Sequence, residues 1–323
     1  MARRSKLRKY IKEYRWSNIA AMIRNNRLDP AHCETGFHGR LVVITGATSG
    51  IGHETARLYA KRGADLLCIN RNEEKSQALR KEIEDEFGVG CRYWIADMSR
   101  LADMHRVGRE LAVLDTPIDV LVHNAGVYVN RRQQTEDGLE LVFAVNYLSS
   151  FVVNYLVRDK LRAQEKARVL LVNSEGHRFA AWGLHLDDLN WEKRSFSGMG
   201  SYGSAKTAQL LSMMIFDDHF SGSGVAINAM HPGAVKTEAG KENGPIYQWF
   251  KTNILERNYR SATISAEALY YLGVSEALDG VSGKFFNLTT EEEPAPPALD
   301  RETAEALWEI SLDMGNLHGS PHV

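Results

Sequence analysis

Residues 41–52 of the chain read LVVITGATSGIG, a short apolar segment that runs directly into a glycine-rich loop. The four apolar residues at 41–44 are typical of a strand that is buried on both faces. The residues after the loop follow a helical pattern. Strand, glycine loop and helix in this order form the context in which such a motif binds a dinucleotide; an ordinary glycine turn is the alternative.

The three glycines of this loop have separate roles in the dinucleotide interpretation. Gly46 would permit the tight turn, Gly50 would let the backbone approach a pyrophosphate, and Gly52 would allow close packing of the helix on the strand. The N–H groups and the positive dipole end of the helix would then face the anion. The other loop residues that we expect at this site are Thr48, Ser49 and Ile51.

Outward from the loop, short apolar segments alternate with helical patterns along most of the chain. We expect strands at residues 41–44, 65–69, 92–96, 119–123, 168–173, 225–230 and 284–287. We expect helices from the glycine loop to residue 62, at 73–87, 101–111 and 136–161, around 202–206, and at 265–273 and 301–314. Strands joined by crossover helices predict an α/β fold with a doubly wound parallel sheet of the Rossmann type. It would have about seven strands, helices on both faces and a single domain at residues 39–317.

Composition and charge narrow the classes of protein that fit. The chain has 323 residues, of which 44% are hydrophobic, and a net charge of −2 that gives no overall attraction to nucleic acid or membranes. The three cysteines show no paired spacing, so we expect thiols in a reducing compartment. No apolar run approaches the ~18–20 residues of a membrane-spanning helix. We therefore expect a cytoplasmic protein without a metal site.

The first 38 residues form a basic extension that differs from the rest of the chain. Nine basic residues face two acidic ones before residue 30, and apolar residues recur among them at roughly helical intervals. One interpretation is an interfacial helix at residues 1–27 that contacts an anionic membrane surface. The other is an extension that packs on the body of the protein, or on a second subunit of a homodimer or homotetramer. Residues 318–323 would form a C-terminal tail.

The end of the second expected strand bears on the choice of dinucleotide. An acid there would bind the adenosine 2′-hydroxyl and repel a 2′-phosphate. This strand instead ends in Asn70 and Arg71, with no acid until Glu73. Arg71 could form charge-assisted contacts with a 2′-phosphate, with Thr48 and His53 adding polar groups nearby; a solvated Arg71 is the alternative. These residues favour NADP(H) over NAD(H) as the cofactor.

Tyr202 and Lys206 stand four residues apart in a stretch with a helical pattern. This spacing places the two side chains on one face of a helix, about one turn or ~5–6 Å apart. A free phenol titrates near ~10, and a cation beside it favours its ionised form. The pair could therefore exchange a proton with an alcohol or carbonyl oxygen. On its own, the pattern also fits a half-buried tyrosine beside a solvated lysine.

Seven motifs in collinear order together resemble the short-chain dehydrogenase/reductase family, over residues 39–317. They are the glycine loop, Asp97 after the third strand, His123-Asn124-Ala125-Gly126, Val145-Asn146-Tyr147-Leu148, Ser174 after the fifth strand, the Tyr202 and Lys206 pair, and His231-Pro232-Gly233-Ala234-Val235-Lys236-Thr237. Beyond the loop, the expected cofactor-binding residues are Asn70, Arg71, Asp97, Met98, Asn124, Ala125, Gly126, Tyr202, Lys206, Pro232, Gly233, Val235 and Thr237.

The resemblance also implies four catalytic residues, which are Asn146, Ser174, Tyr202 and Lys206. Tyr202 would transfer a proton to or from the substrate oxygen while hydride moves between the nicotinamide and the substrate carbon. Lys206 would lower the pKa of Tyr202 and bind the nicotinamide ribose, and Ser174 would donate a hydrogen bond to the developing oxyanion. Asn146 would hold a water that connects Lys206 to solvent. The alternatives are a strand-end cap for Ser174 and, for Asn146, a polar residue that satisfies a helix kink.

Finer features are similar to the retinol-dehydrogenase-like branch of the family, whose members act on lipophilic alcohols, aldehydes or ketones. These features are Leu189-Asn190-Trp191 and Ala306-Leu307-Trp308-Glu309-Ile310-Ser311. Two positions depart from the family pattern. His123 replaces the first Asn of N-N-A-G, where its ring would pack or titrate, and Asn173 replaces a Ser. Glu175 and His177 follow near the expected mouth of the substrate site.

We expect the substrate pocket in residues 176–200 and 238–262, where Tyr247, Trp249 and Phe250 would line an apolar site or lid, or pack beneath a loop. The resulting hypothesis is an NADP(H)-dependent oxidoreductase that interconverts a hydrophobic alcohol and its aldehyde or ketone. One alternative is a dehydratase or epimerase that uses its dinucleotide as an internal redox relay, although the short acidic tail argues against it. Another is a non-catalytic NADP(H)-binding regulatory protein, against which the complete set of catalytic residues argues.

Overall fold

The computed structural model describes residues 9, 10, 12–15, 18, 24, 25, 28–233 and 262–318 of the chain. Their strands form one eight-stranded sheet in the order β3-β2-β1-β4-β5-β6-β7-β8. The strands from β1 to β7 pair in parallel, and β8 pairs antiparallel with β7. The strand order reverses between β1 and β4, which is where open sheets of this kind bind ligands.

The seven expected strands are all present, and each of their ends lies within one residue of the expected position. They are β1 (Leu41–Thr45), β2 (Asp65–Asn70), β3 (Cys91–Ile95), β4 (Val120–His123), β5 (Ala167–Val172), β6 (Val225–His231) and β7 (Phe285–Asn287). The sequence analysis missed β8 (Thr290–Glu291), because two residues are too few for a periodic pattern. The prediction of a doubly wound α/β fold is confirmed.

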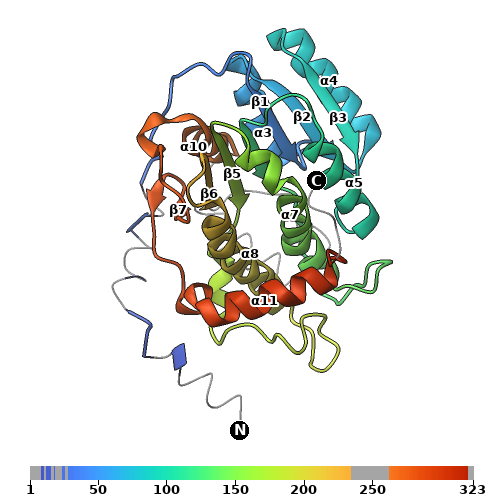
Figure 1. Ribbon diagram of the computed structural model, residues 1–323, viewed down its shortest axis with the longest axis vertical. Helices are drawn as coiled ribbons and strands as arrows, with labels where there is room; N and C mark the ends of the chain where they lie inside the picture. The colour runs from blue at the N-terminus through green and yellow to red at the C-terminus, as the bar shows by residue number, and fades with distance from the viewer. Residues whose placement is uncertain are drawn as a thin grey trace.

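Helices cover both faces of the sheet (Figure 1). One face carries α3 (Gly50–Lys61), α4 (Glu73–Phe87) and α10 (Ala262–Val274), and the other carries α5 (Leu101–Ala112), α7 (Ser149–Arg162) and α8 (Gly198–Phe220). On the second face, α11 (Arg301–Met314) packs on α8. The shorter helical turns are η2 (Glu175–Ala180), η5 (Glu276–Leu278) and η6 (Pro296–Leu299).

The core lies on both sides of the sheet. In β1, Val43 packs on the side of α7, whereas Val42 and Ile44 pack on the side of α3, and all three are 0% exposed. The helical run Leu141–Arg162 is long and apolar enough to cross a membrane by composition, yet 78% of its apolar window is buried. Burial of that extent is typical of the core helix of a globular domain.

The helix expected at residues 136–161 begins later and has an unusual first part. It starts as α6 (Leu141–Phe143), continues as the π-helix η1 (Ala144–Leu148) and ends as α7. The expected start is wrong because Glu140 caps the helix. Its carboxylate accepts hydrogen bonds from the N–H groups of Val142 (3.0 Å) and Phe143 (2.8 Å).

The described residues of the N-terminal segment pack on the body of the protein. Tyr10 is buried, and its hydroxyl donates to the Asp300 carboxylate (2.5 Å). The Tyr14 hydroxyl donates to the carbonyl oxygen of Ala181 (3.2 Å). Of the two interpretations of this segment, these contacts favour packing on the body over an exposed interfacial helix.

Trp308 fastens α11 to the helices beneath it and provides a test of this packing. Its ring centre lies 4.8 Å from that of Phe216 and 5.0 Å from that of Phe151. Because Trp308→Ala would leave a cavity in this aromatic cluster, we expect it to lower the free energy of unfolding by about 3–5 kcal/mol, measured by urea denaturation. Glu309→Ala alters the exposed neighbour and should change stability by less than about 0.5 kcal/mol. Equal losses in both variants would contradict the packing described.

Candidate active site

The carboxyl ends of β1, β4, β5 and β6 meet at one edge of the sheet and bring the candidate residues together. At the reversal between β1 and β4, the Thr45 hydroxyl oxygen accepts hydrogen bonds from the N–H groups of Asn124 and Ala125, both at 3.0 Å. The Asn124 side chain donates in turn to the carbonyl oxygens of Thr45 (3.2 Å) and Gly46 (2.8 Å). The loop after β4, which continues into Gly126, is therefore fastened to the glycine loop.

The glycine loop has the geometry that a dinucleotide site requires. Gly46 and Gly50 have positive φ angles of 72° and 55°, a conformation that favours glycine. A Cβ at Gly52 would lie 2.2 Å from the Gly46 carbonyl oxygen, so α3 can pack on the loop only without a side chain there. A Cβ at Gly50 would meet no atom within 4 Å, so the backbone is open to a pyrophosphate. Ser49 precedes α3 without a side-chain capping bond, which leaves the first-turn N–H groups for an anion.

Asn70 and Arg71 lie beside this loop at the end of β2. The Oδ1 atom of Asn70 accepts the N–H of Ala47 (2.7 Å). Its Nδ2 atom is buried and has no hydrogen-bond partner among the described residues, a cost that a polar cofactor group would remove. Arg71 is exposed. The Nε2 atom of His53 contacts the Glu82 carboxylate on α4 (3.1 Å).

Asp97 and Met98 follow β3 at the same edge of the sheet. One carboxylate oxygen of Asp97 accepts hydrogen bonds from the N–H (2.9 Å) and the hydroxyl (2.8 Å) of Ser99, which closes a tight turn. Asp97 is half-buried and Met98 is buried. The Asp97 carboxylate is therefore held in place at the end of the site where we expect the adenine ring.

Tyr202 and Lys206 lie on α8, next to Ser174 at the end of β5. The Nζ atom of Lys206 is 5.8 Å from the centre of the Tyr202 ring, and it donates to the carbonyl oxygen of Val172 (2.7 Å). A Cβ added at Gly176 would lie 2.6 Å from Cε1 of Tyr202 and 3.2 Å from Oγ of Ser174. Phenol, amine and hydroxyl thus lie together, as the sequence hypothesis requires.

The surroundings of Lys206 alter its charge. Burial lowers the pKa of Lys206 to about 7, far below its ordinary value. The amine therefore titrates near neutral pH, and it is mostly charged only below that pKa. Ionisable groups with perturbed pKa values of this kind cluster at functional sites.

The structure bears on the alternatives for Asn146 and Ser174. Asn146 lies in η1, where its Oδ1 accepts the N–H of Val127 (2.7 Å) and its Nδ2 donates to the Val127 carbonyl oxygen (2.8 Å). The amide is thus engaged with the loop after β4, and the water expected at Asn146 stays a prediction. The Oγ atom of Ser174 accepts the N–H of Gly176 (3.0 Å), as a cap does, while its hydroxyl proton can still be donated.

The sequence of this chain is similar to those of known dehydrogenases. A sequence model described as short chain dehydrogenase matches residues 40–183. Retinol dehydrogenase 13 of Mus musculus is 34% identical over 291 residues, which cover 88% of this chain and 86% of that protein. The chain belongs to the short-chain dehydrogenase/reductase family. It falls in the retinol-dehydrogenase-like branch.

Solved structures share the fold of this short-chain dehydrogenase. The crystal structure of an uncharacterized protein from Mycobacterium paratuberculosis has a TM-score of 0.69 at 26% identity, and the match covers 87% of this chain and 95% of that one. A structure from Beutenbergia cavernae, assigned as an NAD(P)-dependent gluconate 5-dehydrogenase with NADP bound at low occupancy, has a TM-score of 0.62 at 23% identity, with 82% and 99% covered. Family membership makes the chain an oxidoreductase that acts on CH–OH or C=O groups with a nicotinamide dinucleotide.

The positions of two histidines near the site, His177 and His123, were not settled by the sequence. His177 does not lie at the substrate mouth, because it is 1% exposed. Its Nδ1 contacts the carbonyl oxygen of Ser174 (2.8 Å), its Nε2 accepts the N–H of Ala295 (3.0 Å), and burial lowers its pKa to about 3. His123 packs in the core of this dehydrogenase, with Nε2 2.7 Å from Oδ1 of Asn154 and a pKa that burial lowers to about 4.

Two residues that sequence reasoning did not assign to the site contact its members. The Oδ1 atom of Asn173 accepts the N–H of Ser174 (2.8 Å), and its Nδ2 donates to the carbonyl oxygen of Lys206 (3.0 Å). The Tyr128 ring lies edge-on to that of Tyr202, with 5.8 Å between centres. Asn173 could have been found from the sequence, because it stands where the family pattern has Ser. No local pattern marks Tyr128.

Apolar side chains are exposed in the segment expected to bind substrate. Phe179, Trp182 and Met199 are 54%, 48% and 44% exposed, and the Phe179 Cβ would lie 2.9 Å from a Cβ at Gly203, beside Tyr202 on α8. Pro232 and Gly233 follow β6 and are the last residues of the described range 28–233. The residues named for this region that lie outside the described ranges are Val235, Thr237, Tyr247, Trp249 and Phe250.

Gly52→Ala tests the glycine loop as the dinucleotide site. The added methyl group would collide with the Gly46 carbonyl oxygen and push α3 away from the loop. We expect the affinity for NADH and NADPH, measured by fluorescence titration, to fall about 10-fold or more while the circular dichroism spectrum is kept. His53→Ala, one residue along α3, should bind within about twofold of the wild type. Unchanged binding by Gly52→Ala would remove the loop from the cofactor site.

Proposed function

We propose that this chain is an NADP(H)-dependent oxidoreductase that interconverts a hydrophobic alcohol and its aldehyde or ketone, with Tyr202 as general acid and base. The observation that carries the proposal is the convergence of Tyr202, Lys206 and Ser174 at the carboxyl edge of the sheet. A proton donor, a cation that adjusts it and a hydrogen-bond donor for the substrate oxygen are the groups that carbonyl reduction needs from a protein.

Each of these side chains has a part in the proposed reaction. The bound nicotinamide supplies or accepts the hydride. The Tyr202 hydroxyl gives its proton to the substrate oxygen in reduction and takes a proton back in oxidation. Ser174 donates from its hydroxyl to the same oxygen, since the N–H of Gly176 occupies only an acceptor position of its Oγ (3.0 Å).

Lys206 would act on Tyr202 through its charge. In its ammonium form it favours the ionised phenol and so lowers the pKa of Tyr202. Burial opposes that form by lowering the pKa of Lys206 to about 7. Below that pKa, Lys206 carries the charge that this role needs.

Arg71 supports the choice of NADP(H) over NAD(H). It is exposed at the end of β2, and the flanking residues Asn70 and Asn72 carry no negative charge that would repel a 2′-phosphate. A guanidinium can form two parallel charge-assisted hydrogen bonds to such a phosphate. The Nδ2 atom of Asn70, buried without a partner among the described residues, offers another donor at the same strand end.

The substrate class rests on two supports. Phe179, Trp182 and Met199 expose apolar surface in the segment after Ser174. The similar proteins named retinol dehydrogenases are named for a lipophilic alcohol. The cytoplasmic location, a membrane contact of residues 1–27 and a homodimeric or homotetrameric state stay predictions.

Tyr202→Phe tests the proposed chemistry. Because the variant lacks the transferable proton, we expect kcat to fall by about 10²–10⁴-fold with a panel of apolar aldehydes, retinal included, in an assay of NADPH consumption. The dissociation constant for NADPH should stay within about twofold. Tyr128→Phe is the matched control, since it keeps the neighbouring ring and loses only a hydroxyl. Full turnover in Tyr202→Phe would contradict the mechanism, and turnover of substrate without net NADPH consumption would favour the dehydratase or epimerase alternative.

Arg71→Ala tests the cofactor preference. Loss of charge-assisted bonds to the 2′-phosphate should weaken NADPH binding by about 10- to 100-fold and leave NADH binding nearly unchanged, as measured by titration calorimetry. Arg80→Ala removes an exposed arginine of α4 that pairs with Glu84, and it should affect neither cofactor. Equal affinities for NADPH in the wild type and in Arg71→Ala would count against NADP(H).

A further inference from the structure

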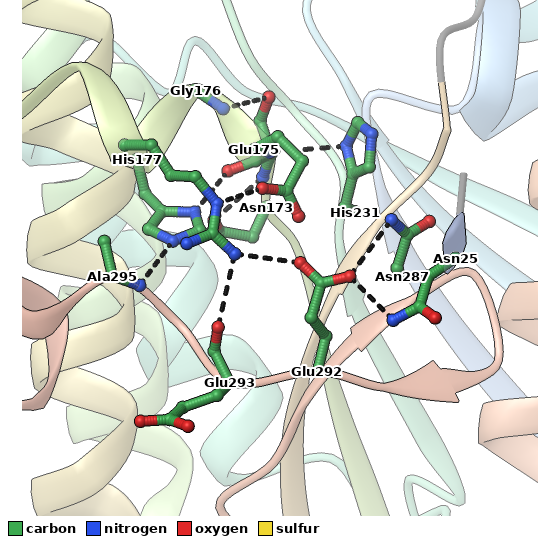
Figure 2. A network of polar contacts seen from close by, with 12 residues as sticks. Asn25, Asn173, Glu175, Gly176, His177, His231, Asn287, Glu292, Glu293 and Ala295 are labelled. Carbon is green, nitrogen blue, oxygen red and sulfur yellow. Dashed lines mark hydrogen bonds and ion pairs between the residues drawn. The ribbon is translucent and has the colours of Figure 1, made fainter. Parts of the chain in front are cut away.

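The residues after Ser174 belong to a buried ionic cluster that the proposed reaction does not use (Figure 2). The Nε atom of Arg178 donates to Oε2 of Glu175 (2.5 Å), and its Nη2 donates to Oε1 of Glu292 (2.8 Å). Only 15% of the Glu175 side chain and 1% of the Glu292 side chain are exposed. One guanidinium therefore lies between two carboxylates that come from η2 and from the segment after β8.

Glu292 joins this cluster to two further segments of the chain. Its Oε2 atom accepts hydrogen bonds from Nδ2 of Asn25 (3.0 Å), in the N-terminal segment, and from Nδ2 of Asn287 (3.4 Å), at the end of β7. With Arg178, Glu292 has three donors. Its buried negative charge is therefore well compensated.

Glu175 is in the opposite situation. Its Oε2 has the contact with Arg178, but its Oε1 is buried and has no hydrogen-bond partner in the part of the chain that the structure describes. A buried anionic oxygen without a donor is costly, and the second carboxylate adds repulsion. A proton on Glu175 removes both costs, because the cluster then holds one carboxylate for one guanidinium.

We propose that Glu175 carries a proton while Glu292 faces Arg178 as a carboxylate, and that Glu175 in this protonated state is a positioning residue for Ser174. Loss of the proton would leave two anions facing one cation in a buried place. The carboxylates would then be driven apart, and the turn that carries Ser174 would move with Glu175.

The backbone around Ser174 shows how this displacement would reach its hydroxyl. Glu175 follows Ser174 directly, and its N–H contacts Nδ1 of His231 (3.4 Å). The next N–H, that of Gly176, holds Oγ of Ser174 (3.0 Å). The side chain of Glu175 thus anchors the turn that aims the hydroxyl toward the substrate oxygen.

The electrostatics of the cluster agree with a proton on Glu175. Burial, opposed by the charge of Arg178 and assisted by that of Glu292, raises the pKa of Glu175 to about 7. Glu175 would therefore gain or lose its proton near neutral pH.

The other titratable groups around the cluster behave differently over this pH range. Burial lowers the pKa values of His177 and His231 to about 3 and 4 and raises that of Tyr14. Glu293 is exposed and gives the cluster only its main-chain carbonyl oxygen (3.2 Å). Lys206 also titrates near 7, but its pKa is lowered, so its contribution to stability rises with pH above 7.

The test compares the pH dependence of unfolding in the wild type and in Glu175→Gln, which keeps the shape of a protonated glutamate. The folded pKa of Glu175 lies above its ordinary value of 4.5, so its stabilisation is fully present below 4.5 and is lost as pH rises through about 7. Relative to Glu175→Gln, the wild type should lose up to about 100-fold in its folding equilibrium constant between about pH 5 and pH 8. Urea denaturation at each pH measures this change.

Three further variants test in which direction the neighbouring charges shift the titration of Glu175. Glu292→Gln removes the repelling charge and should move the Glu175 titration to lower pH. Arg178→Met removes the attraction and should move it to higher pH. Glu293→Gln alters the neighbouring exposed carboxylate. Its stability should depend on pH in the same way as that of the wild type. A difference between the wild type and Glu175→Gln that is the same at every pH, or a titration that neither Glu292→Gln nor Arg178→Met moves, would overturn the proposed proton on Glu175.

The role toward Ser174 rests on the proposed function and has its own readout. The ratio of kcat in the wild type to kcat in Glu175→Gln should fall several-fold as pH rises through about 7, whereas the ratio of KM values for NADPH should stay within about twofold. Lys206 titrates in both proteins, so its effect cancels in the ratio. A kcat ratio that does not change with pH would overturn the positioning role. Absence of turnover in both proteins would count against the proposed function and, with it, the positioning role, while the unfolding curves would still decide whether Glu175 carries the proton.

Discussion

The hydrogen bonds between the end of β5 and α8 hold the candidate site together. Lys206 donates from its side chain to the carbonyl oxygen of Val172 (2.7 Å), and its own carbonyl oxygen accepts from Asn173 (3.0 Å). Asn173 also accepts the N–H of Ser174 (2.8 Å). Strand and helix are thus joined through the residues that we expect to act on the substrate. The position of Ser174 relative to Tyr202 therefore depends on these hydrogen bonds between side chains and the main chain.

Burial at this junction has opposite effects on the two ionisable groups that flank Ser174. It lowers the pKa of Lys206 and raises the pKa of Glu175, and it brings both to about 7. The cause is the same in each case, because removal from water disfavours the charged form of a base and of an acid alike. The buried His177 stays neutral for that reason too. An acid–base site has use for groups whose charge changes near neutral pH.

Much of the fold could be predicted because its signals are local. The helices expected at 73–87 and 301–314 agree with α4 and α11, where hydrophobic periodicity and end signals lie within the segment itself. For the helix expected at 136–161, the predicted first residue was wrong. The helix is capped by the buried Glu140, and glutamate also fits a helix interior. Within the site, residue spacing was enough to find the glycine loop and the pair of Tyr202 and Lys206. Spacing could not predict that His177 is buried.

The sequence by itself determined the order of strands and helices and the types of residue at the candidate site, because both depend on spacing and chemistry along the chain. Only the tertiary structure decided which polar groups meet. It paired the amide of Asn146 with the backbone of Val127, and it gave Glu175 and Glu292 a single guanidinium, that of Arg178. Partners that are distant in the sequence are selected by the packing of the whole domain, and no local pattern records that selection.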